Sequence, residues 1–322
     1  MDVKKVFIRP EPVSEVDKVK LKFLRNNVRS TVCIHLLLFL SSIHPQSDAK
    51  VKQVTVLSDE GVVYRLRALG PGGLDLYPID LEDSVKMATV TRIWMSDTYG
   101  GSHRWGCPKI NKKKFTHGID NFRYINYESC PDAPRTPGAP GLMMGCWGSE
   151  DKTYINQRVF MRVNPGKWLA MGIYDCVPSN PLSREEWDSQ SSAFQNYWVA
   201  EISSKKWATP TRVRIGLRDT LGREPSADEY EQALRDGSYK ALPTNIIKEA
   251  FDLGLENLSV WCMKCVGYDA DLQRALARMP KNYVSLGKKA FAEEPKKGNL
   301  AHPIERLEKV ASKKRKTRAS KY

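Results

Sequence analysis

The feature that most restricts the fold of this chain is the order in which its hydrophobic patterns change. Apolar side chains recur at helical spacing over residues 15–42, short Val- and Thr-rich segments dominate residues 46–222, and helical spacing returns in residues 223–311. Regular alternation of strand and helix is missing, which argues against a Rossmann or barrel fold. We therefore predict an α+β fold, with an N-terminal helix, a body made of a largely antiparallel β-sheet or sandwich, and a C-terminal helical region with a basic tail.

The same patterns divide the chain into four parts. They are an N-terminal arm and helix at 1–45, a strand-rich core at 46–222 with a Gly/Pro-rich loop at about 128–150, a mainly helical region at 223–311, and a flexible basic tail at 312–322. Residues 131–141 are so rich in proline and glycine that we expect a surface loop or a domain linker there, since neither a helix nor an interior strand tolerates them.

Several short segments in the core have the composition of β-strands. Two pairs flank turn residues and predict hairpins: 51–57 with 62–69, and 158–163 with 167–174. Single strands are expected at 86–95, 196–202, 211–217 and 258–266.

Helices are predicted mainly near the two ends of the chain. Ser226 and Glu229 form a capping box, and further helices are expected at 244–253, 269–279 and 303–311. The apolar run 31–43 is too short to span a bilayer, which needs about 20 residues. We favour a buried helix for this run, with a membrane-inserting hairpin as the alternative.

Charge indicates the class of partner rather than the fold. The formal net charge is +14, and residues 288–322 contribute twelve Lys or Arg residues against four Glu. With 41% hydrophobic and 27% charged residues, the composition argues against wholesale disorder, collagen and coiled coil. A polyanionic partner is expected, either nucleic acid or an anionic membrane surface.

Pairs of arginines in the predicted strands suggest a basic sheet face. Alternate residues of a strand point the same way, so each pair would share one face. The pairs are Arg65 with Arg67, Arg158 with Arg162, and Arg212 with Arg214. On one surface they would follow a phosphate backbone, while Trp105, Tyr124, Tyr127 and Trp168 would stack on bases. The alternative is an ordinary solvated sheet face.

A second candidate contact is the Gly-rich segment at residues 100–117. It combines cations with an aromatic side chain, in Arg104, Trp105, Lys112, Lys113 and Lys114. It lacks the Gly-Lys-Ser/Thr sequence of a phosphate-binding loop, so we interpret it as a nucleic-acid contact, or else as an ordinary surface loop.

The cysteines and histidines give weak metal signals. His103, Cys107 and His117 are the candidate zinc ligands, but their spacing is irregular and Cys130 or Cys146 would have to complete the site. No cofactor is therefore predicted. For Cys262 and Cys265, two buried structural thiols are favoured over a redox dithiol or half a zinc site.

The C-terminal tail contains a compact basic cluster. Its residues are Lys313, Lys314, Arg315, Lys316 and Arg318, a pattern typical of nuclear import signals and of nonspecific anchors. Seven scattered cysteines fit reduced thiols. We expect an intracellular protein, nuclear or cytoplasmic, that is not secreted.

These features favour binding over catalysis. Neither a nucleophile elbow nor a paired-histidine motif is present. In outline the chain resembles viral movement, matrix and capsid proteins, which implies a structural or transport protein that coats or escorts RNA or DNA. A homo-oligomer is expected. The alternatives are a peripheral membrane or matrix protein on anionic lipid, and a metal-dependent nucleic-acid-processing enzyme.

Overall fold

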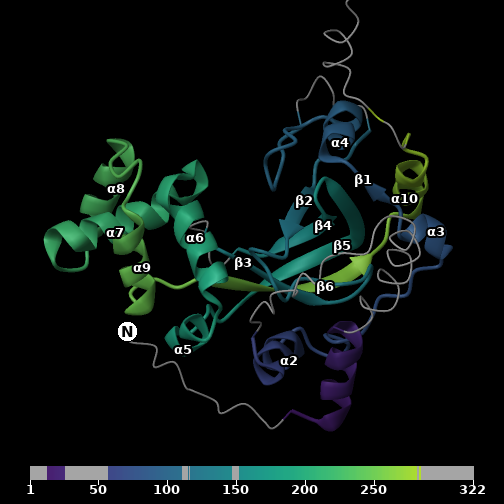
Figure 1. Ribbon diagram of the computed structural model, residues 1–322, viewed down its shortest axis with the longest axis horizontal. Coiled ribbons are helices and arrows are strands. Elements are labelled where there is room, and N and C mark those ends of the chain that lie inside the picture. The colour runs from purple at the N-terminus through teal and green to yellow at the C-terminus, as the bar shows by residue number, and fades with distance from the viewer. Residues whose placement is uncertain are drawn as a thin grey trace, which may run out of the picture. The chain divides into compact units, whose positions relative to one another are not determined.

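The computed structural model describes residues 13–25, 57–110, 115, 117–146, 152–280 and 283. Its centre is a six-stranded sheet in which β2, β4, β5, β6 and β3 follow one another, and β1 pairs with β5 outside this path (Figure 1). All pairings are antiparallel except that of β2 with β4. The strands are β1 (Thr89–Val90), β2 (Phe122–Asn126), β3 (Gly141–Gly145), β4 (Tyr154–Asn164), β5 (Lys167–Ser179) and β6 (Ser259–Gly267).

Helices precede, interrupt and follow the strands. An N-terminal helix covers residues 15–25. The others are α2 (Asp59–Arg67), α3 (Asp83–Lys86), α4 (Arg92–Tyr99), α5 (Arg184–Asp188), α6 (Ser192–Ser204), the 3₁₀ helix η2 (Lys206–Ala208), α7 (Thr209–Leu221), α8 (Ala227–Arg235), α9 (Thr244–Asp252) and α10 (Ala270–Ala277). The predicted α+β class is confirmed, with an N-terminal helix, a mostly antiparallel sheet body and C-terminal helices. The basic tail lies outside the described residues.

The sheet is buried on both faces. Tyr124 of β2 pairs with Phe160 of β4, and both belong to a small core that includes Met95 of α4 and residues of α10. The next pair along these strands, Ile125 with Met161, belongs to the main core on the other face. This division follows from the strand geometry, because successive side chains point to opposite faces.

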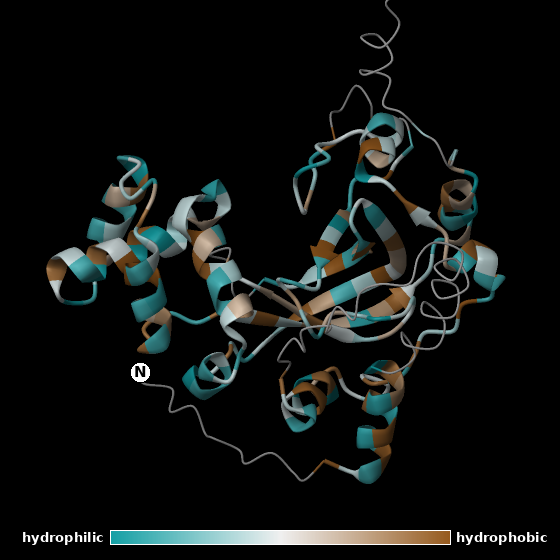
Figure 2. Ribbon diagram, viewed as in Figure 1, coloured by the Kyte–Doolittle hydropathy of each residue, from teal (hydrophilic) through white to brown (hydrophobic). Residues whose placement is uncertain are grey.

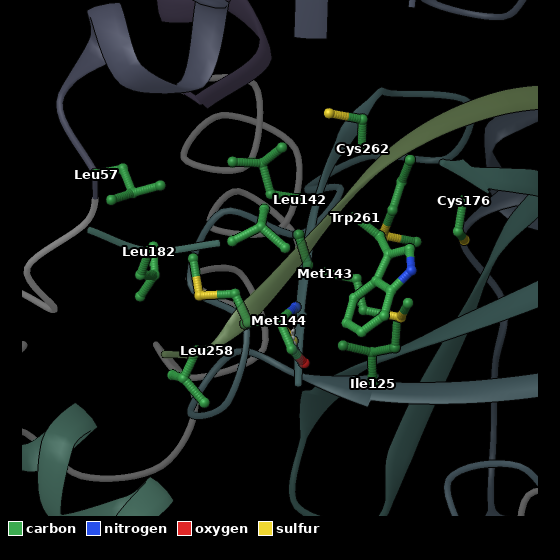
Figure 3. Close-up of a cluster of buried hydrophobic side chains, with 14 of the residues drawn as sticks. Leu57, Ile125, Leu142, Met143, Met144, Cys176, Leu182, Leu258, Trp261 and Cys262 are labelled. Atoms are coloured by element: carbon green, nitrogen blue, oxygen red, sulfur yellow. Dashed lines mark hydrogen bonds between the residues drawn. The ribbon is translucent and has the colours of Figure 1, made fainter. Parts of the chain in front are cut away.

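The main core is rich in sulfur-containing side chains. Figure 3 shows its centre, where Met143 and Met144 of β3 lie beside Trp261 of β6. The indole of Trp261 is fully buried, and its Nε1–H donates to the carbonyl of Lys152 at 3.0 Å. Cys262 and Cys265 are buried free thiols, as predicted, and burial raises the pKa of Cys265 to about 11.

Three segments that we predicted as strands are helices instead. They are 62–69, 196–202 and 211–217. Helix α2 contains 62–67 of the first segment, and α6 and α7 contain the other two. Their apolar residues lie on one helical face, as in α6, where the buried side chains are Phe194, Trp198, Val199 and Ile202. Strand propensity was overridden because these helices pack their apolar faces against the main core.

The turn expected before residue 62 is the start of a helix. The hydroxyl of Ser58 accepts from the backbone N–H of Gly61, which makes Ser58 the N-cap of α2. Likewise, the strand expected at 86–95 is reduced to β1, because Thr91 caps α4 immediately afterwards.

Other local predictions are confirmed. The hairpin of β4 and β5 turns at residues 164–167, β6 occupies the expected segment, and α9 and α10 fill the predicted helices. Ser226 and Glu229 form both hydrogen bonds of the capping box at the start of α8. The predicted strand at 51–57 lies, except for its last residue, outside the described residues, as do the apolar run 31–43 and the helix at 303–311.

The Gly/Pro-rich segment at 131–141 is neither a surface loop nor a linker. Most of it is buried, and Gly138 is bonded through its N–H to Met171 and through its carbonyl to Tyr77. Gly138 has φ of +82°, and a Cβ there would lie 2.5 Å from the Tyr77 carbonyl oxygen. Glycine is required because two backbones approach each other closely inside the core.

The N-terminal helix packs against α2 through one face and leaves another exposed. Leu21 and Leu24 are buried, whereas Val16, Val19 and Phe23 are exposed. Figure 2 shows the hydrophobic and hydrophilic residues alternating along this helix. Among the described residues, no helix is long and apolar enough to cross a membrane.

Candidate nucleic-acid interface

The arginines of the predicted basic sheet face are dispersed over helices and strands. Arg65 and Arg67 lie on α2, where Arg65 forms a bidentate ion pair with Glu186 at 2.7 Å and Arg67 pairs with Asp17. Arg65 is buried and also donates towards the carbonyls of Asn180 and Pro181, so its role is structural.

The pair on α7 is also engaged inside the fold. Arg212 is only 1% exposed, and its guanidinium donates to the carbonyls of Ile202 (2.7 Å), Lys205 (2.6 Å) and Tyr239 (3.0 Å). Burial lowers the pKa of Arg212. Arg214 pairs with the buried Glu256 at 2.8 Å.

The pair on β4 is the only one that lies on a strand. Arg158 is bound to Asp269 at 2.8 Å, and Arg162 faces Glu128 at a looser 3.6 Å. The six arginines therefore do not form one continuous surface, and the structure corrects the hypothesis of a basic sheet face. The physical reason is that four of the six arginines lie on helices, and each of the six has an internal partner.

The described part of the Gly-rich segment, in contrast, lies mainly at the surface. We call residues 100–110 the Trp105 loop. It begins where Gly100 ends α4 with φ of +84°, and the hydroxyl of Ser96 donates to the carbonyl of Gly101 at 2.5 Å. Further on, the carbonyl of Gly106 accepts from the backbone N–H of Tyr124 in β2 at 2.8 Å. The loop is thus tied to the sheet.

Arg92 is the main anchor of the Trp105 loop. Its guanidinium carbon lies 3.5 Å from the ring centroid of Tyr124 and 5.3 Å from that of Trp168. Its Nη2 donates to the carbonyls of Ser102 (3.0 Å) and Trp105 (2.7 Å). A cation that stacks on aromatic rings of the sheet and also bonds two loop carbonyls holds the loop against the sheet. Sequence reasoning missed Arg92, because its partners come from three separate segments.

Of the four aromatic residues proposed to stack on bases, Trp105 is the most exposed. Its side chain is 59% exposed. Tyr124 is buried between Arg92 and Phe160, and the ring centroids of Tyr124 and Phe160 are 5.1 Å apart. Tyr127 donates to the carbonyl of Pro134 and lies under Arg135, and burial raises its pKa to about 12. Trp168 is partly buried against Tyr124.

The end of the Gly-rich segment is fixed by a histidine. His117 Nε2 donates to the carbonyl of Tyr99 at 2.8 Å, and its Nδ1 accepts from the backbone N–H of Ile119 at 3.0 Å. Both ring nitrogens are therefore engaged by the backbone. The exposed Phe115 contacts the His117 ring, and His117 contacts Tyr99.

The three candidate zinc ligands do not come together. His103 and Cys107 are exposed, and both nitrogens of His117 bond the backbone instead. In the part of the chain that the structure describes, no group of three or more His, Cys, Asp or Glu side chains is arranged to hold a metal ion.

The charged side chains of the Gly-rich segment are all basic. Between Asp97 and Asp120 the sequence has five basic residues and no acidic one. Arg104 and Lys109 are exposed on the Trp105 loop, and neither has an ion-pair partner within the described ranges. Lys112, Lys113 and Lys114 lie outside those ranges, as do the tail residues Lys313, Lys314, Arg315, Lys316 and Arg318.

Comparison with known protein families identifies the main part of the chain. A family model described as "Domain of unknown function (DUF6697)" matches residues 89–279, more than half of the 322 residues. This chain belongs to the DUF6697 family. The DUF6697 region contains the whole sheet, the Trp105 loop and helices α4 to α10, whereas α2 and the basic tail lie outside it. No curated protein and no solved structure matches the chain.

Proposed function

We propose that this protein binds single-stranded RNA or DNA without catalysis, through the Trp105 loop, and coats or escorts it. The observation that carries the proposal is the exposed indole of Trp105 on an anchored loop with exposed cations and no acidic residue. An indole stacks on any base, while Arg104 and Lys109 supply the charge that phosphates require.

The anchoring of the loop supports this function energetically. Ordering a flexible loop on binding costs free energy, whereas a loop already held by Arg92 and by the Gly106–Tyr124 hydrogen bond has less entropy to lose. The basic tail would add nonspecific affinity and, as predicted from its sequence, would also serve nuclear import.

Alkylation of Cys107 tests the site directly. Cys107 is exposed two residues from Trp105, whereas Cys130 and Cys176 are buried, with pKa values raised to about 11 and about 12. Because the thiolate is the reactive form and burial disfavours it, iodoacetamide should modify Cys107 before the five other cysteines that the structure describes, all of which are buried. Saturating single-stranded RNA should slow the alkylation of Cys107, as measured by peptide mass mapping.

The matched control for this experiment is Trp105→Ala at the same RNA concentration, where the protection should be largely lost. An unchanged rate of Cys107 alkylation in the wild-type protein with RNA bound would place the nucleic acid elsewhere.

A second candidate function is peripheral binding to an anionic membrane. It is favoured by the exposed stripe of Val16, Val19 and Phe23, which lies beside the exposed Lys22 on the N-terminal helix. Flotation with anionic vesicles distinguishes it, since Phe23→Asp should abolish flotation and leave RNA binding intact.

A further inference from the structure

A groove lies among α7, α9 and the segment between α7 and α8. Its volume is about 410 Å³, and its apolar lining consists of Ile215, Ile246, Ala250, Leu253 and Leu255. Figure 1 shows α7, α8 and α9 gathered together, and none of the residues proposed to contact nucleic acid lines the groove.

Two leucines at the groove are half exposed. Leu253 is 52% and Leu255 is 50% exposed. Gly254, with φ of +70°, ends α9 in a Schellman motif in which the N–H of Leu255 bonds the carbonyl of Ala250. That motif accounts for a local contact of Leu255 with Ala250, but it gives no reason for an exposed leucine at position 253. Clustered exposed apolar side chains beside a groove are typical of interaction sites.

The charged side chains that line the groove, which we call its rim, carry a net negative charge, with three acids against two arginines. Arg218 is bound by Glu224 at 2.5 Å and by Glu256 at 2.7 Å, and Arg223 is bound by Glu229 at 2.7 Å. The bond from Arg223, together with the capping hydrogen bonds of Ser226, lowers the pKa of Glu229 to about 2, so Glu229 stays ionised. Both cations are thereby neutralised. Asp219 and Glu249 line the groove, are exposed, and have no ion-pair partner in the described part of the chain.

We propose that this groove binds a basic amphipathic helical segment of a partner protein. Two or three apolar side chains at helical spacing would enter the groove and cover Leu253 and Leu255, while Lys or Arg side chains would meet Asp219 and Glu249. A helix lying along the groove would cover both half-exposed leucines, which belong to its lining. The net negative rim selects a basic partner over an acidic one.

The test uses the full-length protein and a fluorescein-labelled model peptide with leucine at positions i, i+3, i+4 and i+7 and lysine elsewhere. We expect saturable binding with a Kd of about 100 µM or tighter by fluorescence anisotropy. The double reversal Asp219→Lys with Glu249→Lys should weaken binding by about tenfold, since two exposed carboxylates that attract the peptide lysines are replaced by cations that repel them. Leu253→Ser should weaken it by about fivefold through lost apolar burial.

The controls distinguish binding at the groove from attraction by the overall charge of the protein. Asp80→Lys with Glu82→Lys makes the same charge change at two exposed acids outside the groove, and it should leave the affinity within about twofold of the wild type. A peptide with glutamate in place of lysine should bind at least tenfold more weakly. Equal binding of the two peptides, an equal effect of the two double reversals, or no binding of the lysine peptide would each overturn the proposal.

Discussion

Replacing Trp105 by alanine is expected to weaken binding to a fluorescent single-stranded RNA by roughly 5- to 150-fold. Stacking of one base on an aromatic side chain contributes about 1–3 kcal/mol, and each 1.4 kcal/mol corresponds to a factor of ten. The indole is 59% exposed, and the bond from Arg92 reaches the backbone carbonyl of Trp105, so the substitution keeps the anchor of the loop. Fluorescence anisotropy at one fixed salt concentration measures the effect.

Two further variants make this result specific. Trp105→Phe keeps a stacking surface and should retain most of the affinity. Leu253→Ala removes another large exposed side chain, outside the Trp105 loop, and should leave the affinity unchanged. Wild-type affinity in Trp105→Ala, with an unchanged melting temperature, would exclude stacking on Trp105 as the basis of binding.

Replacing Arg212 by methionine is expected to destabilise the protein by roughly 3–5 kcal/mol. The guanidinium donates to three backbone carbonyls and to the hydroxyl of Thr209, and methionine fills a similar volume without any donor. The carbonyl of Ile202 would then lose its donor in a buried environment. Chemical denaturation measures the change in the free energy of unfolding.

The matched control is Arg235→Met, which removes an exposed arginine from α8 whose guanidinium donates to the side chain of Gln232. It should change the free energy of unfolding by less than about 0.5 kcal/mol. If Arg212→Met instead kept its stability and lost RNA binding, the original hypothesis of a basic contact surface at Arg212 would be restored.

The fold class was predictable because its signals are local. The β4–β5 hairpin is encoded by a turn sequence between two alternating segments, and α8 by the capping box of Ser226 and Glu229. The sequence predicts strands at 196–202 and 211–217 because β-branched and aromatic residues favour strands. Only tertiary packing shows that these residues occupy one face of a helix.

The candidate site was predictable only in part. The cations and Trp105 of the Gly-rich segment are visible in the sequence, as is the lack of acids around them. The ion pair of Arg65 with Glu186 joins residues 121 positions apart, so nothing local reveals that Arg65 is engaged. Nothing local reveals the contacts of Arg92 either, because it bonds loop carbonyls and stacks on aromatic rings from two different strands.

The most direct test of a nucleic-acid site on the folded body is the salt dependence of single-stranded RNA binding, with and without the charge of the tail. The variant to compare with the wild type replaces Lys313, Lys314, Arg315, Lys316 and Arg318 by glutamine in the full-length chain. We expect weaker binding that persists, with the slope of log K against log salt reduced by about 0.7 for each lost phosphate contact. Binding that disappears entirely with the charge of the tail would contradict a site at the Trp105 loop.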